Sequence, residues 1–508
     1  MHRYNFNLDP QAKLSKENLR YLRETELGPE ALAREKEQAE RDREFDAMLR
    51  ELTGETPLPE AQAEEKEEVS PVKPQTTGSR RSEQKTFILD SYSEDETDEL
   101  TSLKEYGERA LARSEHAVNK LSVITDACSG CIRSRYLVTD ACRGCFAKPC
   151  QVNCPKQAIT IVNGRSTIDP DKCISCGRCQ EVCPYHAVIR VPIPCEEACP
   201  VGAISKDESG KEHIDPEKCI LCGKCLQSCP FGAVVEMSQM VDVLKLLADE
   251  NKKVVAMLAP AVLGQFPGTI NNLIGALKKL GFADVVEVAI GADITTRKEA
   301  AEFIEKMENG EKMMTTSCCP AYYKAADLHI PEIKPFVSHT RTPMYYTAEL
   351  LKQEQPECTA VFVGPCLAKR FEAENDPNVD YVLTFEEIGA MLVASGINVA
   401  DCEPQEFAKI SCAQGRRFPV SGGVAGAVAS LVEGKAEFKP TAINGLNKAS
   451  IKLLKQYATK GSDFNMIEVM CCEGGCVAGP GCVALAKKSA IMVENYVKTA
   501  PDLKDKQD

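Results

Sequence analysis

The sequence predicts an α/β C-terminal domain with mostly parallel sheets flanked by helices, preceded by small cysteine-rich α+β modules and a charged N-terminal arm. Three observations predict this arrangement. None of the 26 cysteines lies in residues 1–127, whereas sixteen lie in residues 128–229 and ten follow. Short apolar runs alternate with amphipathic helical patterns after Lys253. The length of 508 residues fits about three domains.

Composition excludes several classes of protein. A net charge of −14 argues against nucleic acid as the main partner, because phosphate binding needs a basic face. No apolar run is long enough to span a membrane, and the start of the chain lacks the apolar stretch of a secretory signal. We therefore expect a cytoplasmic protein with no membrane contact. Disulfides are rare in that compartment, so the cysteines are interpreted as metal ligands or redox groups.

The arm, residues 1–120, is rich in Glu, Lys and Arg. Residues 31–52 place apolar side chains such as Phe45 and Leu49 at helical spacing, which predicts a helix. Residues 53–97 are rich in Pro, Glu, Ser and Thr and are expected to be disordered. A solvated tail is the favoured interpretation of the arm, and a docking segment for a partner is the alternative.

Two stretches, CISCGRCQEVCP from Cys173 and CILCGKCLQSCP from Cys219, match the C-x2-C-x2-C-x3-C-P run of bacterial ferredoxins. In such a run three cysteines bind one [4Fe–4S] cluster and the fourth binds the neighbouring cluster. Zinc sites instead pair two distant CxxC knuckles, so the spacing argues against zinc. The variant run ACRGCFAKPCQVNCP begins at Ala141. Crossed ligation then predicts one cluster on Cys142, Cys145, Cys150 and Cys183, and a second on Cys154, Cys173, Cys176 and Cys179.

The remaining cysteines of this segment account for two more clusters. PCEEACP supplies only Cys195 and Cys199, which is half of a run. Its partner run predicts a third cluster on Cys199, Cys219, Cys222 and Cys225. The cysteines left over predict a fourth cluster, on Cys128, Cys131, Cys195 and Cys229.

The C-terminal domain shows strands and helices in alternation. Apolar runs at residues 254–262, 283–290, 359–366 and 464–472 are predicted strands. Residues 269–282 form an amphipathic helical pattern ended by Gly281, and further helices are predicted over residues 295–310, 384–396 and 422–434. Functional groups collect at the strand ends of such sheets.

Three cysteine motifs follow predicted strands: TTSCCPAYY from Thr315, VGPCLAKRFEAE from Val363 and EVMCCEGGCVAGPGC from Glu468. None has the ferredoxin spacing, so three distant loops are predicted to gather thiolates around one buried metal centre. Outside these motifs, Cys358, Cys402 and Cys412 are predicted to be small packing residues.

The three motifs resemble the signatures TSCCPxW, MPCxxKxxE and ExMxCxxGCxxGGG of the [FeFe]-hydrogenases, in the same order and with the same internal spacing. The resemblance covers Cys128 to Cys482. It implies an α/β catalytic domain with an H-cluster between its lobes, preceded by α+β ferredoxin-like modules. In family terms, the H-cluster is a [4Fe–4S] cluster joined to a two-iron centre that carries CO, cyanide and an azadithiolate.

The resemblance also implies roles for individual residues. Cys476 would bridge the cube to the two-iron centre, and Cys318 matches the thiol that passes protons to the azadithiolate amine. Lys369 matches the lysine that hydrogen-bonds an iron-bound cyanide, with Glu372 as its partner. The cube itself would be held by Cys319, Cys366, Cys472 and Cys476, and the two-iron centre would be packed by Met470 and lined by Ala259 and Pro260.

A proton relay is also implied by the resemblance, in the order Cys318, Glu299, Ser338 and Glu302. The two glutamates are three residues apart on one predicted helix and hence on one face. Without the resemblance they would be interpreted as solvated helix charges, and Ser338 as a loop serine.

The chain departs from the family pattern at several positions. Gly364 stands where the family usually has Met, and Tyr322 replaces the usual Trp. In the stretch Ala259-Pro260-Ala261 an alanine stands where serine is common in the family, and the third motif ends GPGC rather than GGG. All predicted metal ligands are present. The departures bear on catalytic bias, rate and oxygen tolerance rather than on the reaction.

The sequence therefore predicts a hydrogenase that interconverts protons and H₂. Four accessory clusters would pass electrons to or from a ferredoxin-type carrier, and maturation proteins would supply the two-iron centre. The alternatives are a hydrogen sensor, a polyferredoxin and a non-catalytic iron–sulfur assembly relative, which tends to lack the cysteine at Cys318. The predicted parts are an arm (1–120), a first module (121–190), a second module (191–240), a catalytic domain (241–498) and a polar tail (499–508).

Overall fold

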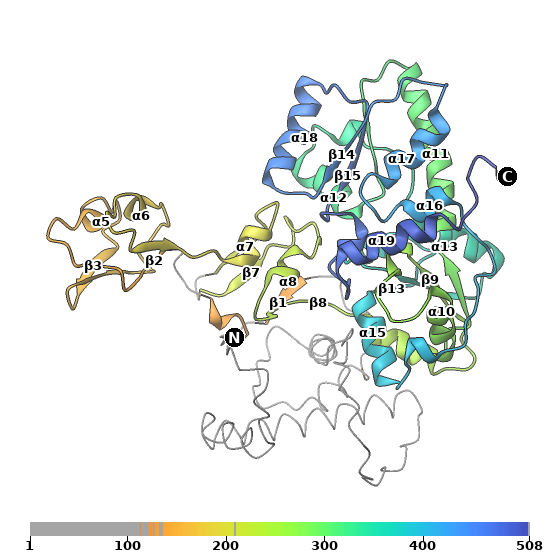
Figure 1. Cartoon of the computed structure of the whole chain (residues 1–508), viewed down its shortest axis with the longest axis horizontal. Helices are drawn as coiled ribbons and strands as arrows, with labels where there is room; N and C mark the ends of the chain where they lie inside the picture. Colours follow the sequence, from red (N-terminus) through yellow and green to blue (C-terminus); the bar gives the residue numbers. More distant parts are fainter. Residues whose placement is uncertain (1–111, 113–120, 125–126, 132–135, 208–209, 506–508) are drawn as a thin grey trace, which may run out of the picture.

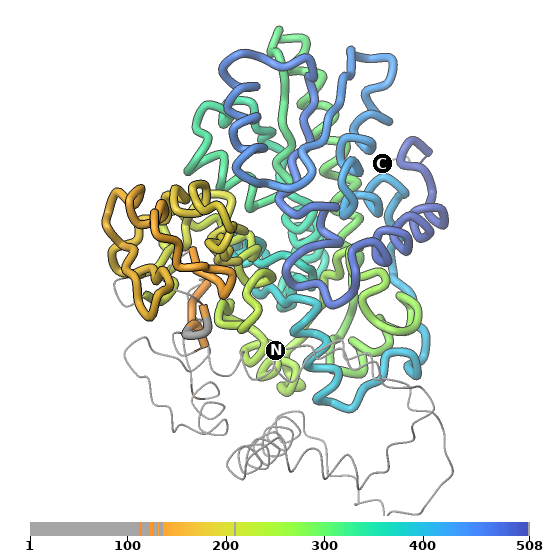
Figure 2. Tube along the Cα trace, turned by 60° about the vertical axis from the view of Figure 1, so that its left-hand side comes forward, coloured from red at the N-terminus to blue at the C-terminus, as the bar shows by residue number. Residues whose placement is uncertain are grey.

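The structure is a computed structural model, and it describes Ala112 and residues 121–124, 127–131, 136–207 and 210–505. The helix and the disordered segment expected in the N-terminal arm lie outside the described residues. The described chain forms two small modules beside two larger lobes, as the ribbon and the turned tube both show (Figures 1 and 2). No described helix is long and apolar enough to cross a lipid bilayer.

The first module contains two antiparallel strand pairs and two single-turn helices. Strand β2 (Tyr136–Val138) pairs with β5 (Val188–Arg190), and β3 (Ile159–Val162) pairs with β4 (Arg165–Ile168). Pro149 begins α5 (Pro149–Val152), where its missing N–H is not needed, and α6 is Arg178–Glu181.

The second module repeats this plan. Here β1 (Leu121–Val123) pairs with β8 (Val234–Glu236), and β6 (Ile204–Lys206) pairs with β7 (Glu212–Ile214), both antiparallel. The short helices are η1 (Ala127–Gly130), α7 (Pro194–Ala198) and α8 (Lys224–Ser228). The second module lies between the first module and the lobes (Figure 1).

The lower lobe in Figure 1 is built on a four-stranded parallel sheet in the order β10-β9-β12-β13. Its strands are buried Val-, Ala- and Leu-rich runs, as expected for a parallel sheet covered on both faces. The bounds are β9 (Val254–Leu258), β10 (Asp284–Glu287), β12 (Thr359–Val363) and β13 (Tyr381–Leu383). The helices that follow these strands or pack on this lobe are α9 (Met240–Leu247), η2 (Pro260–Val262), α10 (Ile270–Lys279), α13 (Pro343–Glu354), α14 (Ala368–Glu374), α15 (Phe385–Ala394), η4 (Val399–Asp401) and α19 (Ala486–Val497).

The upper lobe is built on a three-stranded parallel sheet in the order β11-β15-β14. The central strand β15 is fully buried, with Ile467 opposite Thr315 on one side and Thr441 on the other. The strands are β11 (Met314–Thr315), β14 (Pro440–Asn444) and β15 (Met466–Met470). The remaining helices are α11 (Ala289–Glu308), α12 (Pro320–His329), η3 (Lys334–Phe336), α16 (Ala413–Arg417), α17 (Gly423–Val432), α18 (Lys448–Lys460) and η5 (Cys476–Ala478).

The parallel α/β arrangement is as predicted, whereas all four predicted strands run past their observed ends. The strand predicted over residues 359–366 ends at Val363 and the one predicted over residues 464–472 is Met466–Met470. The predicted strand 254–262 ends at Leu258, because Pro260 cannot donate to a strand ladder and begins η2 instead. The predicted strand 283–290 ends at Glu287, and α11 begins at Ala289, six residues before the predicted helix start. Gly281 follows α10 with a φ of 115°, as expected of a glycine that ends a helix.

Candidate active site

A largely apolar cavity lies between the two lobes, where the loops after β9, β11, β12 and β15 meet. Its volume is about 100 Å³. Because these loops follow the carboxyl ends of parallel strands, side chains that are distant in sequence converge here. The lining includes Ala259, Pro260, Cys318, Cys319, Phe362, Cys366, Lys369, Met470, Cys472 and Cys476.

The four thiols predicted to hold a [4Fe–4S] cluster, those of Cys319, Cys366, Cys472 and Cys476, all line this cavity. Burial raises the pKa of each thiol, and at Cys366 burial and the nearby Cys319 thiolate raise the pKa to about 12. Thiolates crowded into an apolar cavity are costly unless a positively charged group binds them. Iron supplies that charge, so this donor set fits a [4Fe–4S] cluster.

No group of three or more His, Cys, Asp or Glu side chains within the described ranges is arranged to hold a single metal ion. A cube binds its four thiolates at four separate irons, so its ligands stand farther apart than those of a mononuclear site.

Lys369 is the only charged residue among the described residues that line the cavity. Its Nζ donates to Glu372 Oε2 at 2.7 Å and to Thr342 Oγ1 at 3.0 Å, and Thr342 Oγ1 donates in turn to Glu372 Oε1. Burial would lower the pKa of Lys369, but Glu372 outweighs this effect and the pKa is raised. The lysine therefore stays charged at the cavity wall, which fits an anionic ligand there.

Cys318 lies on the cavity beside the predicted ligand Cys319 and outside the predicted ligand set. Burial raises its pKa well above the ordinary value, and the charge of Glu299 adds to that shift. Glu299 is fully buried on α11, and neither of its carboxylate oxygens makes a hydrogen bond. Burial, and to a lesser extent repulsion from the Glu302 carboxylate, raises the pKa of Glu299 to about 8. The nearby Ser317 amide and Ser338 hydroxyl favour the charged form of Glu299 and partly oppose this shift.

The Glu302 carboxylate is surrounded by hydrogen-bond donors. Its Oε2 accepts hydrogen bonds from Ser338 Oγ at 2.7 Å and from Thr340 Oγ1 at 2.8 Å, and its Oε1 accepts the His339 amide at 2.8 Å. Lys306 Nζ lies 3.5 Å from Oε1. Burial would raise the pKa of Glu302, but the hydrogen bonds led by Ser338 outweigh it and lower the pKa. Of the four predicted relay residues, Ser338 and Glu302 are directly hydrogen-bonded, while Glu299 lies close enough for its charge to act on the pKa of Cys318.

Two departures from the family pattern have local explanations. A side chain at Gly364 would overlap the ring of Phe362, which lines the cavity, so Phe362 fills the space beside Gly364. The Tyr322 hydroxyl lies 2.8 Å from Thr315 Oγ1, a hydrogen bond within the first motif that an indole could not reproduce in the same way.

Glu468, the first residue of the third motif, holds α17 in place. Its two carboxylate oxygens accept the amides of Gly422 at 2.7 Å and Ala425 at 2.9 Å, at the amino end of that helix. The motif is thereby tied to the upper lobe as well as to the cavity.

The sixteen cysteines of the modules fall into the four predicted groups. One hollow is lined by Cys142, Cys145, Cys150 and Cys183, and another by Cys154, Cys173, Cys176 and Cys179. In the third predicted set, burial and the nearby Cys199 and Cys222 thiols raise the pKa of Cys219 and of Cys225. In the fourth, burial raises the pKa of Cys131 and Cys195, and the Cys229 thiol lies near both, with Cys128 also near Cys131.

The last cysteine of each run has the same backbone partner. The amide four residues later donates to the thiol sulfur at 3.2–3.4 Å, in a repeated Cys-Pro-x-x-Ala sequence. Such hydrogen bonds stabilise a thiolate and tune an iron–sulfur cluster bound to it. They occur at Cys154, Cys183, Cys199 and Cys229.

Contacts that the sequence analysis did not predict connect the modules to the cavity. Cys222, a predicted ligand of the third accessory cluster, lines the cavity, and the Cys471 thiol is its hydrogen-bond partner. Lys224 Nζ reaches the Leu446 carbonyl, and Gln227 Nε2 donates to the Gly479 carbonyl at 3.2 Å. No sequence signal pairs Cys222 with Cys471, because the contact depends on how the second module docks.

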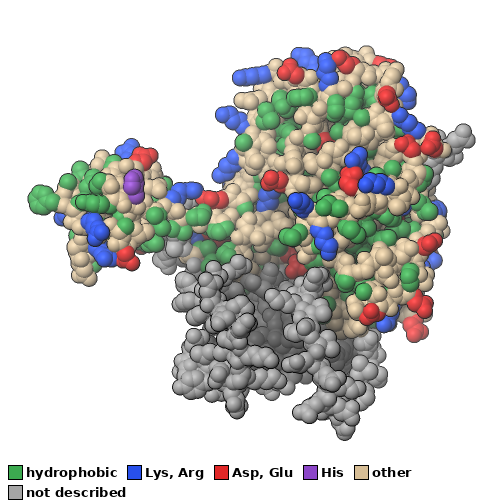
Figure 3. Space-filling model, viewed as in Figure 1, with side chains coloured by type: hydrophobic (Ala, Val, Ile, Leu, Met, Phe, Trp, Pro, Cys, Tyr) green, Lys and Arg blue, Asp and Glu red, His purple; other side chains and the backbone are tan. Residues whose placement is uncertain are grey.

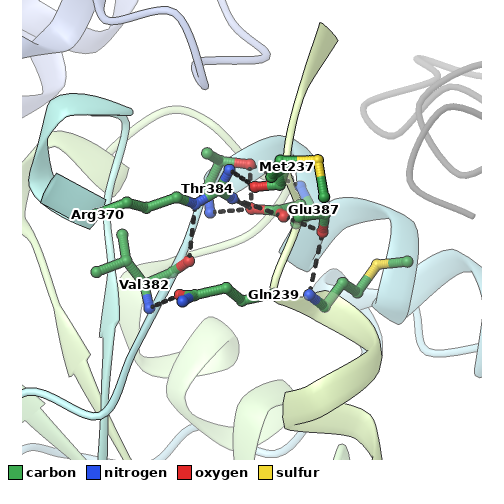
Figure 4. Close-up of polar contacts among 8 residues, drawn as sticks. Met237, Gln239, Arg370, Val382, Thr384 and Glu387 are labelled. Atoms are coloured by element: carbon green, nitrogen blue, oxygen red, sulfur yellow. Dashed lines mark hydrogen bonds and ion pairs between the residues drawn. The ribbon is translucent and has the colours of Figure 1, made fainter. Parts of the chain in front are cut away.

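Arg370 follows Lys369 and is fully buried (Figure 4). Its guanidinium binds both oxygens of Glu387 on α15 at 2.6–2.7 Å and also the carbonyls of Met237 and Val382. Glu387 in turn accepts the Thr384 amide and hydroxyl. This network fixes α14, which carries Lys369 and Glu372, against the segment that leaves the second module.

Of the cysteines predicted to be packing residues, Cys358 and Cys412 are buried. Cys402 is only half-buried, and its thiol donates to the Asn398 carbonyl at 3.4 Å. Cys482, at the end of the third motif, donates to the Val477 carbonyl at 3.3 Å.

Comparison with known proteins agrees with this geometry. Residues 252–480 match the family described as the C-terminal domain of the iron-only hydrogenase large subunit, residues 194–233 match a 4Fe-4S dicluster domain, and residues 166–189 match a 4Fe-4S binding domain. The chain is 32% identical over 372 residues to the periplasmic [Fe] hydrogenase large subunit of Nitratidesulfovibrio vulgaris, covering 62% of this chain and 85% of that one. The chain belongs to the iron-only hydrogenase family.

Other members and relatives of the iron-only hydrogenase family match the chain at lower identity. The NADP-reducing hydrogenase subunit HndD of Solidesulfovibrio fructosivorans is 29% identical over 401 residues, 62% of this chain and 63% of that subunit. A probable cytosolic Fe–S cluster assembly factor of Drosophila virilis is 26% identical over 263 residues, 41% of this chain and 55% of the factor. A solved [FeFe]-hydrogenase of Chlamydomonas reinhardtii is 21% identical with a TM-score of 0.45, over 53% of this chain and 92% of that structure.

Proposed function

We propose that this iron-only hydrogenase relative catalyses 2H⁺ + 2e⁻ ⇌ H₂ at an H-cluster in the cavity between the lobes. The single observation that carries the proposal is the series of acidic and hydroxyl groups behind Cys318. A buried carboxyl with a pKa near 8 beside a buried thiol is costly to fold, and a proton path to a reacting centre gives both groups a task.

The chain's own residues account for binding and proton movement. Cys319, Cys366, Cys472 and Cys476 would hold the cube, and Cys476 would also bridge to the two-iron centre. Lys369 would hold an anionic ligand of that centre, and Ala259, Pro260 and Met470 would exclude water from it. When bound, the two-iron centre would supply a metal site for the reduction of protons and a basic amine that exchanges protons with Cys318.

Proton transfer would run along the residue series. Burial raises the pKa of the Cys318 thiol, so the thiol is protonated and would give its proton to the amine of the two-iron centre. Glu299 would then reprotonate Cys318. Glu299 is both protonated and ionised to a useful extent near its pKa of about 8, so it can release and regain a proton. Ser338 lies beside both glutamates and would relay between them, and Glu302 would collect protons from the half-buried end near Lys306.

Electrons would pass through four [4Fe–4S] clusters in the modules. The third cluster would be the last before the cavity, because its ligand Cys222 is part of the cavity lining. A ferredoxin-type carrier is the proposed partner, with maturation proteins supplying the two-iron centre. A cytoplasmic location in an anaerobic metabolism belongs to the same proposal, although one relative is named as periplasmic.

The second candidate is a non-catalytic iron–sulfur assembly protein, which the assembly-factor relatives favour. Such a protein needs bound clusters but no proton path, whereas a hydrogen sensor would share the reaction at a low rate. Hydrogen evolution from reduced methyl viologen by the chain loaded with its clusters and two-iron centre tests the proposal. Sustained evolution is expected, and loaded protein without evolution would favour the assembly function.

A further inference from the structure

The first module exposes an unusual surface at the cluster hollow lined by Cys142, Cys145, Cys150 and Cys183. Phe146, directly after Cys145, is fully exposed at 101% of its reference area, and Tyr185, two residues after Cys183, is 51% exposed. Arg143 and Tyr185 line the hollow itself. We define the rim patch as Arg143, Phe146, Lys148 and Tyr185.

Charge distinguishes this module from the rest of the chain. Residues 136–190 contain seven Lys and Arg but only four Asp and Glu, in a chain whose net charge is −14. Arg165 and Lys172 pair with Asp140 and Asp169, whereas Arg143, Lys148, Lys156 and Arg178 form no ion pair within the described part of the chain. Bound clusters would add negative charge inside the module, but the side chains that a partner meets first at the rim are basic.

The position of the module also matters. It stands farthest from the two lobes, and hydrophobic and basic side chains are visible together on it (Figures 1 and 3). An exposed aromatic side chain within a basic rim is the usual composition of an interface anchor, and complementary charge speeds encounter with an acidic partner. Electron transfer needs only a small, transient interface, which suits a patch of a few residues.

We infer that the rim patch is the docking surface for a small acidic electron-carrier protein, with Phe146 as the apolar anchor and Lys148 and Arg143 as the charged rim. This inference rests on the proposed function, since it names where that function's electrons enter. The partner's redox centre would face the hollow, so electrons would enter at the cluster held by Cys145 and Cys183.

The first test compares two electron donors on the full, loaded chain: a reduced acidic 2[4Fe–4S] ferredoxin and reduced methyl viologen. Phe146→Ala and Lys148→Glu should each raise the KM for the ferredoxin by about tenfold, with viologen-driven evolution unchanged within about twofold. Lys452→Glu, at an exposed position on α18 in the upper lobe, is the matched control and should leave both rates unchanged. An unchanged ferredoxin KM in both rim variants would overturn the inference.

Salt dependence and direct binding separate this inference from the proposed function. Raising the ionic strength should raise the ferredoxin KM of the wild type and have much less effect on Lys148→Glu. Calorimetric binding of the ferredoxin to the chain loaded with [4Fe–4S] clusters needs no turnover. If Phe146→Ala weakens the binding of the ferredoxin, docking at the rim patch is supported even when no hydrogen is evolved. If hydrogen is evolved and Phe146→Ala binds the ferredoxin as tightly as wild type does, the docking inference is overturned while the proposed function stands.

Cross-linking identifies the occupant of the patch. A photoreactive phenylalanine analogue at position 146 of the full chain should cross-link to the ferredoxin when both are mixed. Cross-links to residues 1–120 of the same chain, which form an acidic arm, or to a second copy would overturn the inference by showing a different occupant.

Discussion

Ser338 donates a hydrogen bond to Glu302 Oε2 over 2.7 Å and so joins the loop after η3 to the middle of α11. The same carboxylate accepts from Thr340 and His339, and these bonds hold its pKa below the ordinary value. Glu299, three residues earlier on the helix, is buried without a hydrogen bond and its pKa is raised. Two carboxyls with opposite shifts on one helix face allow one to keep a charge while the other exchanges a proton.

Replacing Glu299 should change how stability depends on pH. Because its folded pKa is raised from 4.5 to about 8, the folded state binds the extra proton, and the resulting stability is lost as pH rises from about 4.5 through 8. Glu299→Gln stays neutral at every pH. The variant should therefore gain stability relative to wild type, by up to several kcal/mol, between pH 5.5 and 8.5, measured by urea unfolding at matched iron content.

Glu302→Gln is the internal control for that measurement. The pKa of Glu302 is lowered, so its stabilising effect is complete above about 4.5 and is lost only as pH falls through the folded value. Because the Glu302 charge also raises the pKa of Glu299, Glu302→Gln should lower that pKa, and its stability difference from wild type should change with pH much less than that of Glu299→Gln between pH 5.5 and 8.5. A constant stability difference between Glu299→Gln and wild type would show that Glu299 is not protonated in the folded chain.

Most of the cavity could be predicted from sequence because its residues follow strands and have strict spacing. The ends of parallel strands meet at one edge, so cysteines after β11, β12 and β15 had to converge. The series from Glu299 to Glu302 depended instead on resemblance, since two glutamates on a helix look the same whether buried or solvated. The strand ends at Leu258 and Glu287 were misjudged because apolar residues continue into η2 and α11.

Other features could not be predicted because they depend on packing between distant segments. The pairing of Arg370 with Glu387 links two helices and the chain after the second module, and nothing local marks either residue as buried. The overlap of Phe362 with the space beside Gly364 depends on the direction of a ring that turns back over the strand end. Contact between Cys222 and Cys471 depends on module docking.

The buried Arg370–Glu387 pair should contribute much more to the free energy of unfolding than a surface ion pair does. Arg370→Met leaves a buried carboxylate without its partner, which should cost about 3–5 kcal/mol of unfolding free energy. Arg417→Met breaks the exposed pair with Glu494 and should cost less than about 1 kcal/mol. Denaturant unfolding of both variants measures the contrast, and equal costs would mean that the buried network does not stabilise the lobe.

Gly364 should not tolerate a side chain while Phe362 keeps its place. Gly364→Ala should destabilise the protein by about 1–3 kcal/mol, because the new methyl group meets the Phe362 ring. Gly426→Ala on α17 has free space and should stabilise by roughly 0.5–1 kcal/mol through helix propensity. Thermal unfolding of both variants tests the pair. A neutral Gly364→Ala would show that the ring moves freely.

Iron content tests the cluster count. Five cubes and a two-iron centre need about 22 irons per chain, and Cys128→Ser should lower this to about 18 by removing one cube. Cys402 lies outside every predicted ligand set, so Cys402→Ser should leave the iron content unchanged. A fully reconstituted wild type near 14 irons, or no loss in Cys128→Ser, would contradict the assignment of the module cysteines.

Cys318→Ala, measured for infrared spectrum and hydrogen evolution on the same loaded sample, tests the central claim most directly. Alanine can neither donate nor accept a proton, and Cys318 lies outside the predicted ligand set, so the iron-bound CO and cyanide bands should stay as in wild type. Turnover should fall by roughly 10²–10⁴-fold, the usual size of a lost acid–base step. Near-normal turnover with the bands intact would contradict the proton path through Glu299, and the absence of those bands from matured wild type would contradict the hydrogenase assignment itself.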